Sequence, residues 1–249
     1  WVTTQDFGGG AGRGLYKTTD GGITWIKKLN DAAGGVALNR FADGQHWFAQ
    51  NRQAISRSSN DGETWNNSTI TGYQTNEFQT LFTGNNLSNT AGDTVWSGTN
   101  GGRVLRFTNY GADREFFGTN LGASTSITSI AFHDHANGLC YSRNINSVNR
   151  VARSTDGGAT WSLLPNQPGT GTSWSIAAVP EWPGFYVLAS NYASTGKVAI
   201  TTNFGDSWTI ESINDIFNGV TFTSPSTGWI GASWVESDTV PAMFKYVGA

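Results

Sequence analysis

The sequence has few of the features that mark helical, membrane-spanning or disulfide-linked proteins. Charged residues make up 13% of its 249 residues, six residues are prolines, and there is one methionine and one cysteine. The longest apolar runs, such as ITSIAF at residues 127–132, are far shorter than the roughly 18 residues that a membrane-spanning helix needs. A single cysteine excludes an internal disulfide, and Cys140 in the apolar stretch NGLCYS is predicted to be a buried, inert thiol. We therefore predict a chain without a membrane span.

The charge balance excludes a class of partner. Fifteen lysines and arginines stand against 18 aspartates and glutamates, which gives a net charge of −3, and no basic stripe runs along the chain. Binding to a nucleic-acid backbone needs such a basic surface. We therefore expect no nucleic-acid partner.

The sequence does have many glycines and tryptophans, and a repeat. Its 32 glycines and 11 tryptophans are typical of short strands joined by tight turns. The repeat centres on an aspartate or asparagine that recurs at intervals of 40, 49, 47 and 47 residues. The five copies are KTTDGGITW, RSSNDGETW, RFTNYGADREF, RSTDGGATW and ITTNFGDSW, with Asp20, Asn60, Asn109, Asp156 and Asn203 at this position.

The segments around each copy predict the fold. Alternating segments precede and follow each copy, and two such segments with a tight turn between them are typical of a β-hairpin. A further pair of alternating segments lies upstream, so each repeat holds four strands, A to D in order, with the motif in the C–D turn. Four-stranded units at a period of 40–50 residues are typical of β-propeller blades. The sequence thus predicts an all-β protein with a single propeller domain of four-stranded antiparallel blades over residues 1–249.

Both ends of the chain are predicted to hold incomplete blades. Residues 1–5 match strand B, so the first blade lacks strand A, and MFKYVGA at residues 243–249 matches strand C without a following D. The two ends therefore duplicate strands B and C and do not complete one another within one blade. About six blades are represented, and we expect a seven-bladed ring in a longer protein of which this chain is a part.

Each position of the motif Ser/Thr-x-Asp/Asn-x-Gly-x-Thr/Ser-Trp has a local structural reason. A carboxylate or amide oxygen in a turn accepts hydrogen bonds from nearby backbone N–H groups, and the glycine supplies the positive φ that the turn requires. The tryptophan is large enough to pack between neighbouring blades. A catalytic residue has no reason to recur once per blade, so we assign structural roles to the motif residues Asp20, Trp25, Asn60, Asp61, Trp65, Asn109, Asp156, Trp161, Asn203 and Trp208.

A metal at these turns is not expected. The stretches TDGG and NDG look superficially like calcium loops, but the glutamate at position 12 of an EF-hand is absent. We predict no metal and no cofactor.

The five copies resemble the bacterial neuraminidase repeat, or Asp-box. That resemblance implies that the box turns lie on the propeller face opposite the binding cleft. The stretches VWSGTNGGRVLRFTNYG, ITSIAFHDHANGLCYS, TGWIGAS and MFKYVGA look like the large exported propeller proteins of Bacteroidetes, which carry a C-terminal sorting domain for type IX secretion. This finer resemblance implies an extracellular or cell-surface location.

A sialidase active site is not identifiable in the sequence. A sialidase would need three arginines for the substrate carboxylate, a Tyr–Glu pair as nucleophile and its activator, and an aspartic acid as acid/base. That family's Arg-Ile-Pro segment is absent from this sequence, and no Tyr–Glu pair is identifiable. Alternation along the C strands explains Arg57, Arg106 and Arg153 as outward-facing residues. The segment FHDHANG at residues 132–138 joins strands A and B on the box side, so its histidines and aspartate are interpreted as solvated turn residues.

A binding surface is expected on the opposite face, in the loops that join strands B to C and D to the next A. These loops are the longest and most variable segments, and their aromatic residues are not explained by packing between blades. Aromatic side chains there can stack on a sugar ring or an apolar partner, with polar neighbours beside them. The predicted rim consists of Phe7, Arg13, Tyr73, Glu77, Asn191, Tyr192, Trp234 and Glu236.

Two classes of function remain. The first is a non-enzymatic propeller, secreted or displayed on the cell surface, that acts as a binding or structural module for a glycan or protein partner. The alternative is a carbohydrate-active enzyme of the sialidase or xyloglucanase type, or a degenerate relative. An enzyme would bring two or three acids together at the centre of the opposite face, each with a shifted pKa. An intracellular assembly factor is a third reading, but the basic or otherwise distinctive groove that it would need is not visible in the sequence.

Overall fold

The computed structural model describes most of the chain, in twelve segments. They are residues 1–4, 14–30, 37–41, 43–51, 53–80, 92–122, 125–143, 150–169, 172–192, 195–213, 217–232 and 243–246.

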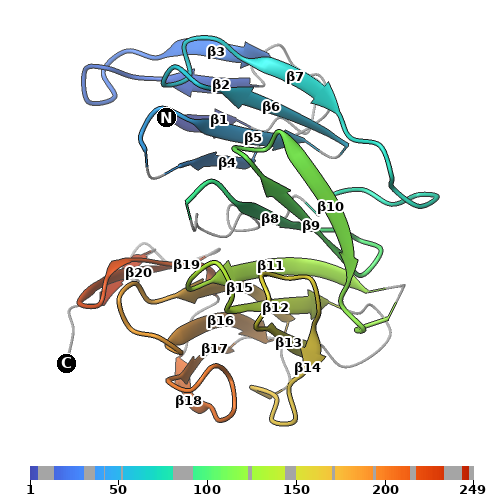
Figure 1. The fold of residues 1–249 in the computed structure, drawn as a ribbon. Helices are drawn as coiled ribbons and strands as arrows, with labels where there is room; N and C mark the ends of the chain where they lie inside the picture. Colours follow the sequence, from blue (N-terminus) through green and yellow to red (C-terminus); the bar gives the residue numbers. More distant parts are fainter. Residues whose placement is uncertain are drawn as a thin grey trace.

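The described strands form six antiparallel sheets that follow one another in chain order (Figure 1). Sheet 1 consists of β1 (Val2–Thr4), β2 (Gly14–Lys17) and β3 (Ile26–Asn30). Sheet 2 consists of β4 (Ala37–Arg40), β5 (Trp47–Asn51), β6 (Ala54–Ser58) and β7 (Asn66–Thr69). Sheet 3 consists of β8 (Val95–Gly98), β9 (Arg103–Thr108) and β10 (Asp113–Gly118).

The second half of the chain forms the other three sheets. Sheet 4 consists of β11 (Ser126–Phe132), β12 (Gly138–Arg143), β13 (Arg150–Ser154) and β14 (Ser162–Leu163). Sheet 5 consists of β15 (Thr172–Ala178), β16 (Tyr186–Tyr192), β17 (Thr195–Thr201) and β18 (Thr209–Ile213). Sheet 6 consists of β19 (Phe217–Ser224), β20 (Thr227–Ala232) and β21 (Met243–Tyr246).

The arrangement is that of a β-propeller with blades of three or four antiparallel strands. Within each sheet the strands pair in meander order, as predicted from the repeat. The first strands of neighbouring sheets lie side by side, so that β15 contacts β11 on one side and β19 on the other. In Figure 1 the sheets are arranged around an arc, from sheet 1 in blue to sheet 6 in red. The all-β propeller that the sequence predicts is therefore confirmed.

Three of the sheets have three strands among the described residues, namely sheets 1, 3 and 6. Within the described residues, sheet 1 has strands B to D and sheet 6 has strands A to C. Sheet 3 differs from the prediction, because its expected A strand is represented among the described residues by one bridge, between Gln79 and Thr99. The rest of that segment, residues 81–91, lies outside the described residues.

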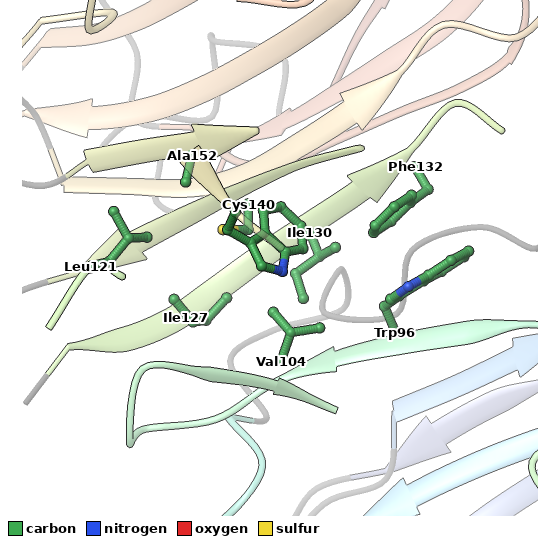
Figure 2. Packing of buried hydrophobic residues seen from close by; sticks show 9 residues of the cluster. Trp96, Val104, Leu121, Ile127, Ile130, Phe132, Cys140 and Ala152 are labelled. Atoms are coloured by element: carbon green, nitrogen blue, oxygen red, sulfur yellow. The ribbon is translucent and has the colours of Figure 1, made fainter. Parts of the chain in front are cut away.

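The hydrophobic core is distributed over the contacts between neighbouring sheets. Between sheets 3 and 4, Trp96 stacks on Phe132 with ring centroids 3.8 Å apart (Figure 2). Cys140 lies in the same buried cluster as both aromatic rings. Burial raises the pKa of the Cys140 thiol well above its ordinary value, because a thiolate is poorly solvated there. The predicted burial of Cys140 is confirmed.

The box turns are closed by their own side chains. In the fourth turn, residues 154–161, the Asp156 carboxylate accepts hydrogen bonds from the Thr160 backbone N–H and hydroxyl at 2.9 and 2.6 Å. The Ser154 hydroxyl accepts from the Gly158 N–H at 2.8 Å, and the Trp161 indole donates to the Gly158 carbonyl at 2.9 Å. Burial raises the Asp156 pKa, but the hydrogen bonds from Thr160 and Ser154 outweigh it and leave that pKa below its ordinary value.

The box turns and the corners between strands A and B share one face. In sheets 2 to 5, the residue after the box aspartate or asparagine donates its N–H to a carbonyl of the A–B corner of the same sheet. The acceptors are Gln45, Asp93, Ala136 and Gly184. This repeated bond ties each box turn to its sheet and leaves the B–C and D–A loops at the other face.

Candidate functional site

The predicted rim on the face opposite the box turns is described in part. Tyr73 and Glu77 lie within the described residues. Asn191 and Tyr192 lie at the end of β16, where the backbone pairs with β17, but their side chains are outside the described part. The other four predicted rim residues, Phe7, Arg13, Trp234 and Glu236, lie outside the described residues.

Glu77 is a buried anion rather than an exposed rim residue. Its side chain is 2% exposed, and Arg103 Nε donates to Glu77 Oε1 at 3.0 Å. The Thr99 hydroxyl donates to the same oxygen at 2.6 Å. The other oxygen accepts from the Gln74 N–H at 2.8 Å and from the terminal nitrogen of Arg103. A buried charge is stable only when it is paired and hydrogen-bonded, and Glu77 meets both conditions.

Opposing influences set the charge state of Glu77. Burial raises its pKa, but the hydrogen bonds from Arg103, Thr99 and the Gln74 backbone, together with the Arg103 charge, leave that pKa below its ordinary value. The carboxyl group is therefore ionised at neutral pH. An ionised, fully bonded carboxylate holds structure and has no proton to donate to a substrate.

The Glu77–Arg103 pair fixes the loop that joins sheet 2 to sheet 3. Arg103 also donates to the Gly72 carbonyl at 2.9 Å. The Gln53 amide donates to the Glu77 carbonyl at 2.8 Å, and the Asn100 amide donates to the Asn76 carbonyl at 3.1 Å. The loop, residues 70–80, is thus anchored to the B–C turns of both neighbouring sheets.

An aromatic and cationic stack supports the start of the same loop. The Tyr73 and Phe116 rings lie edge to face with centroids 5.1 Å apart, and the Arg103 guanidinium carbon lies 4.1 Å from the Phe116 centroid. Burial raises the Tyr73 pKa well above its ordinary range, against a smaller lowering from its hydrogen bond to Gln79. The Tyr73 ring therefore packs on Phe116 and its hydroxyl bonds Gln79, so that the side chain is only partly exposed.

The exposed part of this loop is a short polar turn. Residues 74, 75 and 76 are exposed, and the Glu77 N–H closes the turn on the Gln74 carbonyl at 3.0 Å. Asn76 adopts a positive φ of 61°, which asparagine tolerates better than most residues. We call residues 73–76 the rim turn. It exposes amide and hydroxyl groups, and the buried Glu77–Arg103 pair holds the turn in place.

Several residues of this site were missed from the sequence. Arg103, Thr99 and Asn100 lie in the stretch GTNGGR, which reads as a glycine-rich turn between two strands. The available signal was one arginine immediately after that turn, at the start of a C strand. An isolated glutamate in one loop and an arginine 26 residues later show no pattern that pairs them.

The carboxyl groups with a shifted pKa in the described part of the chain all shift in the same direction. Each resolved carboxyl pKa shift there is downward, at Asp20, Asp43, Asp61, Glu63, Glu77, Asp134 and Asp156. A glycosidase general acid needs a raised pKa. No group of three metal-ligating side chains occurs among these residues either.

The His133–His135 corner is a capped turn between β11 and β12. The Asp134 carboxylate accepts from the backbone N–H groups of Ala136 and Asn137 at 2.8 and 2.7 Å. Burial raises the Asp134 pKa, but these bonds and the Asn137 amide leave it lowered. The assignment of this aspartate to a turn on the box face agrees with these contacts.

No protein-family model matches the chain, and no curated protein matches it. Solved structures do share its fold. A structure of YCF48 bound to a D1 peptide is 16% identical, with a TM-score of 0.55 over 79% of this chain and 60% of that one. A GH74 enzyme of Niastella koreensis is 19% identical, with a TM-score of 0.58 over 87% of this chain and 30% of that one. An ancestral GH74 enzyme is 15% identical, with a TM-score of 0.66 over 95% and 36%.

This chain therefore spans 60% or less of the length of these three structures. At such identities the likeness shows the propeller fold, and a fold of this kind hosts many functions. In the part of the chain that the structure describes, no helix is long and apolar enough to cross a membrane.

Proposed function

We propose that this protein is a non-enzymatic binding module, secreted or displayed at the cell surface, that holds a partner on the face opposite the box turns. The observation that carries the proposal is the rim turn, which the buried Glu77–Arg103 pair fixes in place. A fixed turn loses little conformational entropy on binding. Little of the free energy of a partner's contacts is therefore lost to ordering this turn.

The exposed side chains of the rim turn suit a polar partner. Glu77 and Arg103 neutralise each other in an ion pair beneath the turn, and the Arg114 charge acts on Tyr73 from nearby. Recognition then rests on the exposed amide of Gln74, the hydroxyl of Thr75 and the amide of Asn76. These groups can bond to a peptide backbone or to sugar hydroxyls. We favour a peptide segment of another protein, because the YCF48 structure, which shares this fold, is bound to a D1 peptide.

The wider setting of the protein belongs to the same proposal. The five box copies and the stretches that look like exported Bacteroidetes propellers support export, with type IX secretion as the route. A ring of about seven blades is part of the same proposal, supported by the six sheets of the described residues.

A carbohydrate-active enzyme of the sialidase or xyloglucanase type is the second candidate. The fold that this chain shares with GH74 enzymes favours it. The lowered pKa of Glu77 weighs against it, because that carboxylate lies on the expected binding face and is already neutralised by Arg103.

Selection from a displayed peptide library, in parallel with a glycan array, tests the proposal. We expect peptide ligands whose affinity falls about tenfold or more in the double variant Gln74→Ala/Thr75→Ala, since losing central polar contacts costs more than about 1.4 kcal/mol. The matched control is Thr155→Ala/Thr202→Ala, which removes two exposed hydroxyls from the box face.

Three results of that experiment would overturn the proposal. Ligands that bind both double variants equally well would move the binding surface away from the rim turn. Ligands that are lost in the control variant would move it to the box face. Release of reducing sugar from xyloglucan or sialosides would replace the binding module with the enzyme.

A further inference from the structure

Four cations on C strands lie three residues before a box aspartate or asparagine, and three of them bond the box turn of the next sheet. In each of these three, the acceptor is the carbonyl of the residue that follows the box aspartate or asparagine. The bonds run from Lys17 to Asp61 at 3.0 Å, from Arg106 to Gly157 at 3.2 Å and from Arg153 to Phe204 at 3.5 Å. The contact therefore recurs at three boundaries between sheets.

The same three cations also have a carboxylate partner. Glu63 and Asp206 occupy the same position of their turns, three residues after the box asparagine. Glu115 is instead the cross-strand partner of its cation within sheet 3. The ion pairs are Lys17 with Glu63 at 2.7 Å, Arg106 with Glu115 at 3.6 Å and Arg153 with Asp206 at 2.8 Å.

The fourth cation, Arg57, lies at the boundary between sheets 2 and 3 and has neither kind of partner. Ala112 stands at the position of Glu63 in the third box turn, and the cross-strand partner of Arg57 is the neutral Asn66. Within the described part of the chain, Arg57 makes no hydrogen bond or ion pair, and its Nε is buried without a partner. A buried polar group without a partner is costly, so this nitrogen points to a ligand.

A second arginine, Arg114, points into the same boundary. It stands where the other four box copies have tryptophan. The Phe48 and Phe107 rings meet across the boundary with centroids 4.7 Å apart, and Arg57 is paired with Phe48 as Arg114 is with Phe107. Directly paired residues of two antiparallel strands point to the same side. The two arginines therefore extend from facing sheets into one boundary, where a Cβ on Gly111 would lie 3.0 Å from Arg57 Cδ.

The acids that flank Arg114 in the chain do not neutralise it. Side chains alternate along a strand, so Asp113 and Glu115 point to the other side of β10. Glu115 pairs with Arg106 there, and Asp113 accepts a hydrogen bond from the Asn109 amide at 3.3 Å. Arg114 itself is exposed, and it has no ion pair among the described residues.

The acids nearest to the two ends of this boundary are bonded to other groups. Segment 81–91, which lies outside the described residues, contains no acidic residue. Two positive charges thus share this boundary without a counter-charge from the described chain. The bonded acids are Asp43 with the His46 ring, Asp93 with the Asn109 N–H and Glu77 with Arg103.

We propose that Arg57 and Arg114 form a carboxylate-binding site at the outer part of the boundary between sheets 2 and 3, and that another molecule supplies the carboxylate. A guanidinium matches a carboxylate with two parallel N–H···O bonds, and Arg57 can give its buried Nε to one of them. The bound group then takes the place that Glu63 and Asp206 hold in their turns. It also relieves the repulsion between the two arginines.

The carboxylate belongs either to an acidic side chain of a partner protein or to a free carboxylic acid. The chemistry is the same, and the affinities of two probes distinguish the sources. The site does not include the rim turn, so this inference does not rest on the proposed function. Gln74→Ala/Thr75→Ala should bind both probes like the parent protein, which keeps a failure of this site separate from a failure of the rim turn.

Titration followed at the Arg57 Nε–H signal tests the site. The signal that is missing from ¹H–¹⁵N spectra of Arg57→Gln identifies it. We expect the signal to move in a saturable way with glutarate, a free dicarboxylate, and with hexaglutamate, an acidic peptide. Chloride at the same ionic strength should leave it in place, because screening acts on all exposed charges alike. Tighter binding of hexaglutamate per carboxylate assigns a partner protein, and equal binding assigns a free acid.

Substitution of each arginine measures its share. We expect Arg57→Gln to weaken glutarate binding about tenfold or more, since hydrogen bonds to charged groups are worth that much. Arg114→Gln should weaken it roughly two- to fivefold, as for an exposed charge. The Gly111 backbone N–H signal reports binding in both variants. Arg150→Gln, which removes an exposed arginine from sheet 4, is the control and should bind like the parent.

An internal carboxylate should replace the external one. Ala112→Glu places an acid at the turn position where Glu63 bonds Lys17. We expect the Arg57 signal to lie at its ligand-bound position without any probe, and glutarate binding to fall at least about tenfold. The urea midpoint of unfolding should rise. Ala159→Glu adds the same acid to the fourth turn, which meets sheet 3 instead, and should leave glutarate binding unchanged.

Four results would overturn the proposal. The first is an Arg57 signal that neither glutarate nor hexaglutamate moves. The second is phosphate binding as tight as glutarate binding, which would replace the carboxylate with a general anion. The third is an equal loss of affinity in Arg57→Gln and the Arg150→Gln control. The fourth is an Ala112→Glu protein that binds glutarate like the parent, because the ligand would then lie away from the place of Glu63.

Discussion

The fourth and first box turns have nearly the same sequence and very different surroundings. Both close on themselves, with the tryptophan indole donating to the glycine carbonyl at 2.9 Å in the fourth turn and 3.0 Å in the first. Trp161 is 2% exposed, while Trp25 is 40% exposed. The Trp96 ring of the preceding sheet covers Gly158, and Phe132 of the turn's own sheet packs on Trp161, whereas among the described residues only the turn's own Trp25 ring lies close to Gly22. The motif thus encodes the turn, and its burial depends on the strands packed around it.

The largest expected effect is the difference in stability between variants of Trp161 and Trp25. We expect Trp161→Ala to lower the free energy of unfolding by about 3–5 kcal/mol, the usual cost of emptying a buried aromatic site. Trp25→Ala should cost about 1 kcal/mol, because a partly exposed ring loses less buried area. Urea denaturation followed by circular dichroism measures both. Equal losses would contradict the view that the preceding sheet buries the turn.

The Glu77–Arg103 pair offers a smaller but specific effect on the other face. Glu77→Gln keeps the shape of the side chain but leaves the Arg103 guanidinium without its counter-charge, and we expect a loss of about 2–3 kcal/mol in the free energy of unfolding. Glu211→Gln removes an exposed carboxylate and is the control. If both variants unfold at the same urea concentration, the rim turn is not held by this pair.

Acid should weaken the box turns, and one substitution should reduce that effect. The Asp156 pKa is lower in the folded protein than its ordinary value of 3.8. Its stabilisation is therefore present above that value and is lost as the pH falls through the folded pKa. Asp156→Asn should cost less than about 1 kcal/mol at pH 7, because Asn60 and Asn203 make equivalent turn bonds.

The pH effect is measured by urea denaturation between pH 7 and pH 3. The parent protein should lose stability below about pH 4 more steeply than Asp156→Asn, which has no carboxyl group to protonate at this position. Parallel curves for the two proteins would show that the Asp156 carboxylate is not responsible.

The sequence predicts the turns, the strand order and the propeller because these depend on local chemistry that repeats. The position of Asp156, Gly158 and Trp161 in one short pattern is enough to identify a closed turn between two strands. Five copies in register then give the fold. The same count agrees with sheets 1 and 6 having three strands each among the described residues.

The contacts between segments far apart in the sequence were harder to predict. Strand alternation predicts that Arg106 and Arg153 face outward. It does not predict that each bonds the next box turn, 51 and 53 residues further along the chain. Glu77 carries a charge that typically places a side chain at the surface, and its burial depends on Arg103. The cation three residues before each box was a usable signal, because it recurs in four of the five copies.

One matched pair of substitutions tests the central comparison most directly. Gly158→Ala and Gly22→Ala place the same methyl group at a positive φ, 86° and 96° respectively, so both carry similar backbone strain. Only at Gly158 does the added methyl press on the ring of the preceding sheet, 3.1 Å away. Measured on dilute protein by urea denaturation, Gly158→Ala should lose about 1–3 kcal/mol more stability than Gly22→Ala. Equal losses would contradict the view that the Trp96 ring of the preceding sheet covers the fourth turn.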